Sequence, residues 1–359
     1  MSDKRERARR ETRRRFEQWA RNPECHANVI SAVHNVKMGA AARRENPDAP
    51  REGQSVFALS RGQSFEGSLL RDDGSVLLDS LVTADVIPAG ANEFVDHRIA
   101  VNDGPLRDLE NAIEKSRQLL QRLADGQQGP GAVSSFTARI PRGIMLPEAI
   151  LIIDVLAIRT DGDHPTLEVG EVKTYADLGG HTSRGDLASA RAQMGLYVHA
   201  LEVTLEGLGL AEQVDVSRSG FLILTYPGSN QPSVRSGEDL RYQLERARRG
   251  FDLMEEAAHL MNGEYGAGDE NDPDSLFDLV LHAETSFQES CVSFCERADA
   301  CFRSALAAGR GSALGDDMER FLNGIALDRA VALLKGATPT SAAESDFLVR
   351  SQDPLPELP

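Results

Sequence analysis

Apolar residues in the middle of the chain form continuous runs of strand length. The run AILIIDVLAI at 149–158 is interrupted by a single acid, and a turn-forming TDGDHP segment separates it from LEVGEVKTY at 167–175. A third apolar run, GFLILTYP, lies at 220–227. Runs of this length, bounded by turn residues, predict buried strands.

Segments on both sides of these runs favour helices, because their apolar residues have helical spacing or because they mix polar and apolar residues over a long stretch without helix-breaking residues. The predicted helices cover 4–21, 54–70, 105–125, 186–208 and 238–262. Because helices precede, separate and follow the strands, we expect an α/β fold.

Composition and charge narrow the functional classes. The 359 residues are 41% hydrophobic and 26% charged, as in an ordinary soluble protein, and no run of eighteen apolar residues is present. The first residues are highly charged and lack an apolar signal region, so we expect a cytoplasmic protein with no membrane partner. A net charge of -17 argues against coating nucleic acid by bulk charge, although an enzyme could still bind a few phosphates locally.

The acid inside the first apolar run is Asp154, and burying an ionised carboxylate is costly unless it is paired or bound to a cation. On the next predicted strand, Glu171 and Lys173 are two residues apart and therefore share a face. Two carboxylates suit Mg²⁺ or Mn²⁺, and a lysine can position or deprotonate the attacking water in phosphodiester hydrolysis. An Asp–Lys ion pair beside an unrelated edge-strand glutamate would explain the same residues.

Gln193 and Tyr197, in the predicted helix that follows, are spaced i, i+4 and lie on one helical face. The pair alone could be an ordinary detail of an amphipathic helix. Together with the Asp154 and Glu-x-Lys pattern, it resembles the RecB-like branch of the PD-(D/E)XK nuclease superfamily. The resemblance covers about 54–226 and implies an α/β restriction-endonuclease-like core, with a mixed central sheet flanked by helices.

The segment FALSRGQSFEGSL looks like the leading helix of that family. Gly62, Phe65 and Glu66 match its common G-x2-FE pattern, although Glu66 could equally be an exposed helical glutamate. Ile153 stands where the family often has proline before the aspartate. The resemblance implies that Asp154 and Glu171, with Glu66, bind the divalent metal.

The same resemblance gives roles to the remaining side chains of the pattern. It implies that Lys173 orients the attacking water, and that Gln193 and Tyr197 support the placement of DNA and of the lysine.

Four cysteines bracket this core: Cys25 stands alone, while Cys291, Cys295 and Cys301 fall within eleven residues. The layout is similar to that of the iron-staple nucleases, such as AddB-type helicase-nuclease subunits and certain CRISPR-associated adaptation nucleases. It implies a [4Fe–4S] cluster that joins N- and C-terminal helical segments. The C-x3-C-x5-C spacing departs by one residue from the usual first gap. Zinc is the rival occupant, and free buried cysteines are the simpler alternative.

The predicted organisation has four parts. An N-terminal helical segment with the first cluster cysteine covers 1–53, the nuclease core 54–265, a C-terminal helical segment with the other three cysteines 266–335, and a disordered tail 336–359. The expected function is metal-dependent hydrolysis of DNA, on single strands or ends, in DNA repair or in defence against foreign DNA. A non-catalytic DNA-binding or scaffold subunit and an RNA-directed nuclease are the alternatives. With no G-x4-GK-[ST] loop in the sequence, an ATP-driven helicase would be a partner.

Overall fold

The computed structural model describes most of the chain, in the ranges 12–47, 56–91, 93–97, 107–140, 149–177, 182, 184–269, 272–288, 291 and 295–352. In chain order, its elements are α2 (Thr12–Arg21), α3 (His26–His34), α4 (Met38–Glu45), α5 (Val56–Leu69), α6 (Arg71–Thr83), β1 (Phe94–Asp96), α7 (Arg107–Ala124), β2 (Ala132–Ile140), β3 (Ala149–Arg159), β4 (Thr166–Ala176), α8 (Arg184–Leu208), β5 (Asp215–Thr225), β6 (Pro232–Asp239), α9 (Arg241–Tyr265), α10 (Pro273–His282), α12 (Ala298–Ala308), the 3₁₀ helix η2 (Gly311–Leu314), α13 (Asp316–Leu322), α14 (Leu327–Leu334) and α15 (Ala342–Gln352).

The chain forms two compact units. The first contains residues 1–16 and 53–256, and the second contains residues 17–52 and 257–359. No helix in the described part of the chain is both long and apolar enough to cross a bilayer.

The first unit is built on a six-stranded mixed sheet with the order β1-β2-β3-β4-β5-β6. Strands β2, β3 and β4 form an antiparallel meander, whereas β4 and β5 are parallel neighbours connected through α8. The expected α/β fold with a mixed central sheet flanked by helices is confirmed.

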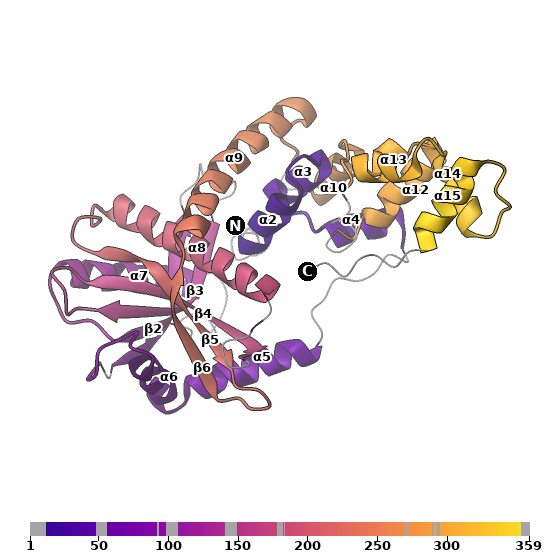
Figure 1. Cartoon of the computed structure of the whole chain (residues 1–359). Helices are drawn as coiled ribbons and strands as arrows, with labels where there is room; N and C mark the ends of the chain where they lie inside the picture. Colours follow the sequence, from indigo (N-terminus) through magenta and orange to yellow (C-terminus); the bar gives the residue numbers. More distant parts are fainter. Residues whose placement is uncertain are drawn as a thin grey trace. The chain divides into compact units, whose positions relative to one another are not determined.

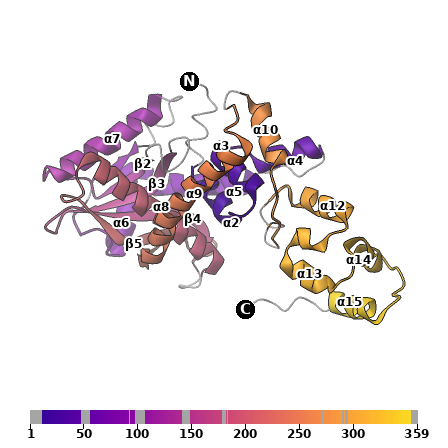
Figure 2. The ribbon, with the colours of Figure 1, turned by 90° about the horizontal axis from the view of Figure 1, so that it is seen from above.

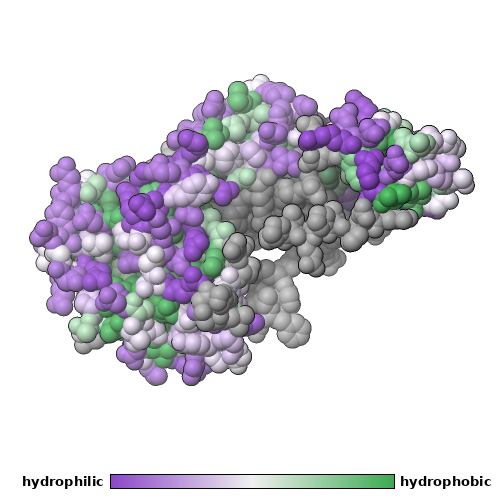
Figure 3. Space-filling view, in the orientation of Figure 1, coloured by the Kyte–Doolittle hydropathy of each residue, from purple (hydrophilic) through white to green (hydrophobic). Residues whose placement is uncertain are grey.

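Helices cover both faces of this sheet (Figure 1). Helices α5 and α6 pack on one face, where Phe65, Leu69 and Leu77 join Val172 and Phe221 in a continuous apolar core. Helices α7 and α8 lie on the opposite face, and α8 crosses in front of the strands in the view from above (Figure 2). Side chains of neighbouring strand residues therefore enter different layers. The visible outer surface of this unit is mainly hydrophilic, with small hydrophobic areas between polar ones (Figure 3).

The second unit joins the N-terminal helices α3 and α4 to the C-terminal helical segment through α10. The side chain of Asn22 donates a hydrogen bond to the carbonyl of Ser286 at 2.8 Å, and the backbone N–H of Ala27 donates to the carbonyl of Glu284 at 3.2 Å. These bonds connect residues more than 250 positions apart in the sequence, so both ends of the described chain contribute to one core.

The tail predicted to be disordered at 336–359 contains helix α15, so that expectation is wrong for 342–352. Phe347 of this helix is 1% exposed and packs on the ring of Phe321, with ring centroids 5.5 Å apart. Glu344, in the first turn of the helix, also forms an ion pair with Arg329 at 2.7 Å. Leu348 packs against the same apolar cluster as Phe347, so this helix is held by apolar contacts as well as by the ion pair. Residues 353–359 lie outside the described residues.

Candidate active site

Asp154 lies where the pairing of β3 and β4 ends. The antiparallel ladder runs from Arg159 opposite Thr166 to Val155 opposite Gly170, and Asp154 is the next residue on β3. Its carboxylate oxygen Oδ2 accepts a hydrogen bond from the backbone N–H of Val172 at 3.1 Å. The carboxylate thus satisfies a backbone donor on the neighbouring strand and is fixed beside the residue that separates Glu171 from Lys173.

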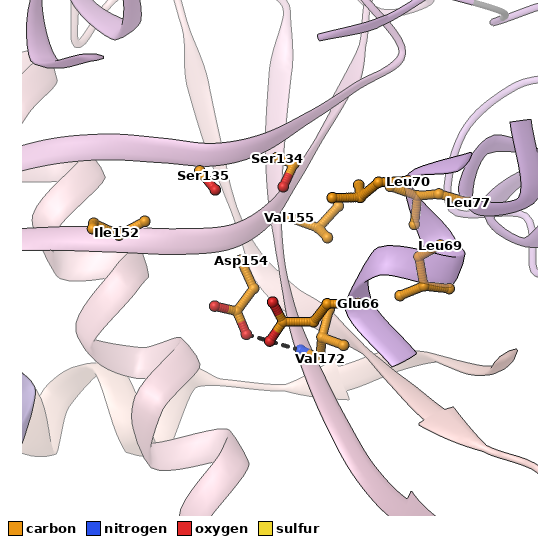
Figure 4. Close-up of a pocket in the computed structure, with 10 residues that line it drawn as sticks. All are labelled: Glu66, Leu69, Leu70, Leu77, Ser134, Ser135, Ile152, Asp154, Val155 and Val172. Carbon is orange, nitrogen blue, oxygen red and sulfur yellow. Dashed lines mark hydrogen bonds between the residues drawn. The ribbon is translucent and has the colours of Figure 1, made fainter. Parts of the chain in front are cut away.

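A cavity of about 210 Å³ opens beside this carboxylate (Figure 4). Glu66 of α5 and Asp154 of β3 enter it from two different elements, and Figure 4 shows their carboxylates side by side near Val172. The cavity is lined by Glu66, Leu69, Leu70, Leu77, Ser134, Ser135, Ile152, Asp154, Val155 and Val172. A concave, mostly apolar cavity with a few converging polar groups is the usual form of a ligand-binding site.

Glu171, Lys173, Gln193 and Tyr197 form a continuous polar chain on the α8 side of the sheet. The Lys173 ammonium pairs with Glu171 and also donates to Oε1 of Gln193 at 3.3 Å. Nε2 of Gln193 in turn donates to the Tyr197 hydroxyl at 2.5 Å. The side chain of Glu171 is 0% exposed, so the buried carboxylate is compensated by the lysine, and the i, i+4 pair on α8 holds that lysine in place.

The structure therefore brings the six predicted site residues into two neighbouring groups, Glu66 with Asp154 and the chain from Glu171 to Tyr197. The peptide group of Val172 connects them, because its N–H bonds Asp154 while its sequence neighbours are Glu171 and Lys173. The described residues that line the cavity do not include Glu171. Nor do three or more His, Cys, Asp or Glu side chains of the described residues form a metal-binding arrangement.

The donor set nevertheless suits a hard divalent cation. Mg²⁺ keeps several of its waters and usually takes only one or two protein carboxylates, with the substrate supplying further oxygens. Glu66 and Asp154, which line one cavity, provide such a pair.

Two residues of the site, Ser134 and Ser135 of β2, were missed by the sequence analysis. Both hydroxyl side chains line the cavity, although their residues are 0% and 5% exposed. The two serines of the AVSSFTARI segment carry little signal, because they interrupt the apolar alternation that marks a strand. Only the pairing of β2 with β3, in which Ser134 lies opposite Val155, brings them beside Asp154.

In the second unit, three of the four cysteine sulfurs have identified hydrogen-bond partners. Sγ of Cys291 accepts from Nδ2 of Asn22 and from the backbone N–H of Gln288, both at 3.4 Å. Cys295 accepts from the backbone N–H of Arg297, and the thiol of Cys301 is hydrogen-bonded to the side chain of Thr285. N–H groups directed at sulfur favour the thiolate form, which is the form that binds metals.

The four thiols are also close enough to affect one another electrostatically. Burial raises the pKa of Cys295 to about 12, the backbone N–H of Arg297 opposes this, and Cys291, Cys301 and Cys25 raise the pKa further. Burial likewise raises the pKa of Cys301, while the guanidinium of Arg297 opposes that increase. A positively charged metal centre would reverse these shifts, since metal-bound thiols are deprotonated.

Arg297 is a buried cation beside the cysteines and is 5% exposed. Its Nη2 and Nε bond the two carboxylate oxygens of Glu45 at 2.7 and 2.8 Å, and its Nη1 donates to the carbonyl of Val280 at 2.9 Å. Burial lowers its pKa, but the pairing with Glu45 more than offsets this, so the pKa of Arg297 is raised. The guanidinium therefore stays charged next to Cys295 and Cys301.

Comparisons of this chain with protein-family models, with curated proteins and with solved structures gave no match.

Proposed function

We propose that the chain is a divalent-metal-dependent DNA nuclease that hydrolyses phosphodiester bonds. The observation that carries the proposal is the hydrogen bond between Asp154 and the peptide N–H of Val172. It brings the acid of β3 next to the Glu171 and Lys173 pair of β4, which is the juxtaposition that the PD-(D/E)XK resemblance implies. The mixed sheet flanked by helices supports the same resemblance.

Glu66 and Asp154 would hold the divalent cation in the cavity, with Glu171 as the third carboxylate of the site. When bound, Mg²⁺ or Mn²⁺ would supply charge stabilisation at the phosphate and lower the pKa of a coordinated water. The protein contributes fixed oxygen ligands, because Asp154 is held by a backbone donor rather than by a flexible side chain.

Lys173 would orient the attacking water. Its ammonium is bound by Glu171 and Gln193, which restricts a flexible side chain to one position. Tyr197 fixes the amide of Gln193, so two residues of α8 determine where the lysine charge lies. A half-buried ammonium that is held by the Glu171 carboxylate and the Gln193 amide would be suited to orienting a water for attack on phosphorus.

DNA is the proposed substrate because of the resemblance, and a helicase or another ATP-driven subunit is a proposed partner on the same basis. The test is incubation of the purified full chain with end-labelled single-stranded DNA and Mn²⁺. Lys173→Ala is the inactivating variant, and Lys115→Ala, an exposed lysine on α7, is the matched control.

We expect cleavage by the wild type and by Lys115→Ala, and none by Lys173→Ala. Equal inertness of all three proteins under varied divalent metals would favour a non-catalytic DNA-binding or scaffold subunit. Cleavage of labelled RNA but not of DNA would reassign the substrate. Circular substrates distinguish endonuclease from exonuclease action.

We further propose that Cys25, Cys291, Cys295 and Cys301 bind a [4Fe–4S] cluster. The N–H donors to Cys291 and Cys295, the side-chain hydrogen bond of Thr285 to Cys301 and the buried charge of Arg297 favour a thiolate-bound group over free thiols. Anaerobic purification followed by iron, acid-labile sulfide and zinc analysis tests this proposal. Iron and sulfide in equal amounts would support the cluster, and one zinc per chain would support a structural zinc site. The absence of both metals would show that the cysteines are free.

A further inference from the structure

The serine beside Asp154 has a backbone conformation that is rare in strands. Ser135 has φ of 57°, in the left-handed region that L-residues other than asparagine and aspartate seldom adopt. It lies within β2 and is 5% exposed, so neither a turn nor a chain end explains it. Strain of this kind persists only where the surrounding structure enforces it, and it concentrates at functional sites.

Strand pairing places Ser135 opposite Asp154. The pairs on either side are Ser134 with Val155 and Phe136 with Ile153, so the register sets Ser135 opposite Asp154 at the one position where this part of the ladder is interrupted. The conformation is held locally, because Oγ1 of Thr137 donates to the carbonyl of Ser135 at 3.0 Å.

The strained residue changes which way the side chains point. Neighbouring strand residues normally enter opposite faces of a sheet. Here both Ser134 and Ser135 line the same cavity, and Figure 4 shows both hydroxyls on the side of the strand that faces Asp154. The positive φ at Ser135 thus adds a second hydroxyl to the candidate active site.

The serine hydroxyls supply the hydrogen-bond donors that the carboxylates of this cavity cannot supply. Its other polar side chains, Glu66 and Asp154, are carboxylates, which only accept hydrogen bonds when ionised. A phosphate group also carries negative oxygens and needs donors as well as a cation. Among the described residues that line the cavity, the side chains of Ser134 and Ser135 are the O–H donors.

We propose that Ser135 is a substrate-binding residue whose hydroxyl donates to a non-bridging oxygen of the phosphodiester group bound beside Asp154. The inference rests on the proposed nuclease function and assigns a contact that the sequence pattern did not contain. It also gives the strained backbone a purpose, since an ordinary strand conformation would send this hydroxyl to the other layer.

Two variants separate the hydroxyl from the strain. Ser135→Gly removes the hydroxyl and relieves the positive φ, whereas Ser135→Ala removes the hydroxyl and keeps the strain. Ser80→Ala on α6 is the control, because its hydroxyl bonds only a carbonyl of its own helix, that of Val76. We expect both Ser135 variants to lower kcat/KM on single-stranded DNA by about tenfold, the effect of one hydrogen bond to a charged group.

Melting temperature and a sulfur-substituted substrate make the test specific. Ser135→Gly should melt at or above the wild-type temperature, so its loss of activity could not come from unfolding. Substrates with a single phosphorothioate of defined configuration at the scissile position should lose the same contact in the wild type. For one configuration, the rate penalty of sulfur should therefore shrink in Ser135→Gly.

Full kcat/KM in Ser135→Gly, or a sulfur penalty equal to that of the wild type for both configurations, would overturn the assignment while leaving the nuclease proposal intact. A wild type that does not cleave any nucleic acid would overturn both. The two failures are thus distinguishable in one set of assays.

Discussion

Asp154 accepts a hydrogen bond from the peptide N–H of Val172 at 3.1 Å, one residue away from both Glu171 and Lys173. Because of this bond, the charge of the Asp154 side chain can be removed while its position is kept. In Asp154→Asn, the amide oxygen can still accept from Val172, so the local structure should persist while the anionic ligand is lost. We expect kcat/KM in Mn²⁺ to fall by about 100-fold or more, about 2.7 kcal/mol of transition-state stabilisation.

Circular dichroism of Asp154→Asn should match the wild type, and thermal melting in the absence of metal should be unchanged or slightly higher, because a partly buried charge has been removed. Asp161→Asn, in the exposed turn after β3, is the control. Full activity of Asp154→Asn would contradict its role as a ligand.

Tyr197→Phe tests whether α8 positions the catalytic lysine. The substitution removes the oxygen that accepts from Nε2 of Gln193, an amide that is 2% exposed, and a buried unsatisfied donor costs about 1–3 kcal/mol. The amide can then rotate away from Lys173. We expect a decrease in kcat of about tenfold with little change in KM, measured at saturating single-stranded DNA.

Tyr242→Phe, at a position 73% exposed on α9, should leave kcat unchanged. In a double-mutant cycle, Tyr197→Phe should have no further effect in a Gln193→Ala background if it acts through the amide that holds the lysine. Additive effects would show that Tyr197 acts on DNA by itself.

Gly170→Ala tests the packing that ends the β3–β4 ladder. A Cβ built at Gly170 would come within 2.1 Å of the Phe221 ring, so the aromatic side chain would have to move. Overpacking of this kind typically costs about 1–3 kcal/mol. We expect the midpoint of urea unfolding to fall and activity to fall with it, because Gly170 is the last paired residue before Glu171.

Gly207→Ala is the matched control, since nothing lies within 4 Å of a Cβ at that position on α8. It should leave stability unchanged or raise it by up to about 1 kcal/mol. A Gly170→Ala protein as stable as the wild type would show that Phe221 moves at no cost.

The sequence predicts the parts of this fold in which local pattern and burial agree. The apolar runs at 149–158 and 167–175 became β3 and β4, and the helices at 54–70 and 186–208 became α5 and α8 within a few residues. Asp154, Glu171 and Lys173 stood out because charged residues are unexpected in apolar strands. Gln193 and Tyr197 could be placed because the i, i+4 rule fixes their common face.

Other features depend on contacts that no local pattern contains. Strand β2 reads AVSSFTARI, with two serines next to each other, and its burial depends on β1, β3, α7 and α8, which all pack against it. The Ser135 conformation and the hydrogen bond from Val172 to Asp154 follow from strand register, which is a property of two segments together. Helix α15 was missed because its large apolar residues, Phe347, Leu348 and Val349, are consecutive and therefore show no helical spacing.

Glu168 on β4 should make stability depend on pH. Burial raises its pKa to about 7 from 4.5, with Arg159 acting weakly in the opposite direction. The folded protein therefore binds more protons than the unfolded chain between about pH 4.5 and 7, and this contribution to stability is lost as the pH rises through that window. Glu168→Gln removes the charge that burial penalises.

We expect Glu168→Gln to match the wild type near pH 4.5 and to exceed it at pH 8. After allowance for solvent at this half-buried side chain, the difference should be about 1–2 kcal/mol. Chemical unfolding at both pH values measures it, with the exposed Glu212→Gln as control. A difference that is the same at pH 4.5 and pH 8 would contradict the shifted titration.

Arg297 offers the sharpest test of the cysteine site, because its charge and its structural role can be separated. Four thiolates around a metal centre leave net negative charge in a buried place, and Arg297 is a buried cation next to Cys295 and Cys301.

Arg297→Gln removes the charge, whereas Glu45→Gln weakens the ion pair but keeps the guanidinium. If the cation compensates thiolate charge, metal retention during chelator challenge should fall by about tenfold in Arg297→Gln and much less in Glu45→Gln. Arg303→Gln, an exposed arginine on α12, should retain the wild-type metal content. Equal losses in Arg297→Gln and Glu45→Gln would instead show that the ion pair acts by holding α4 to the cysteine segment.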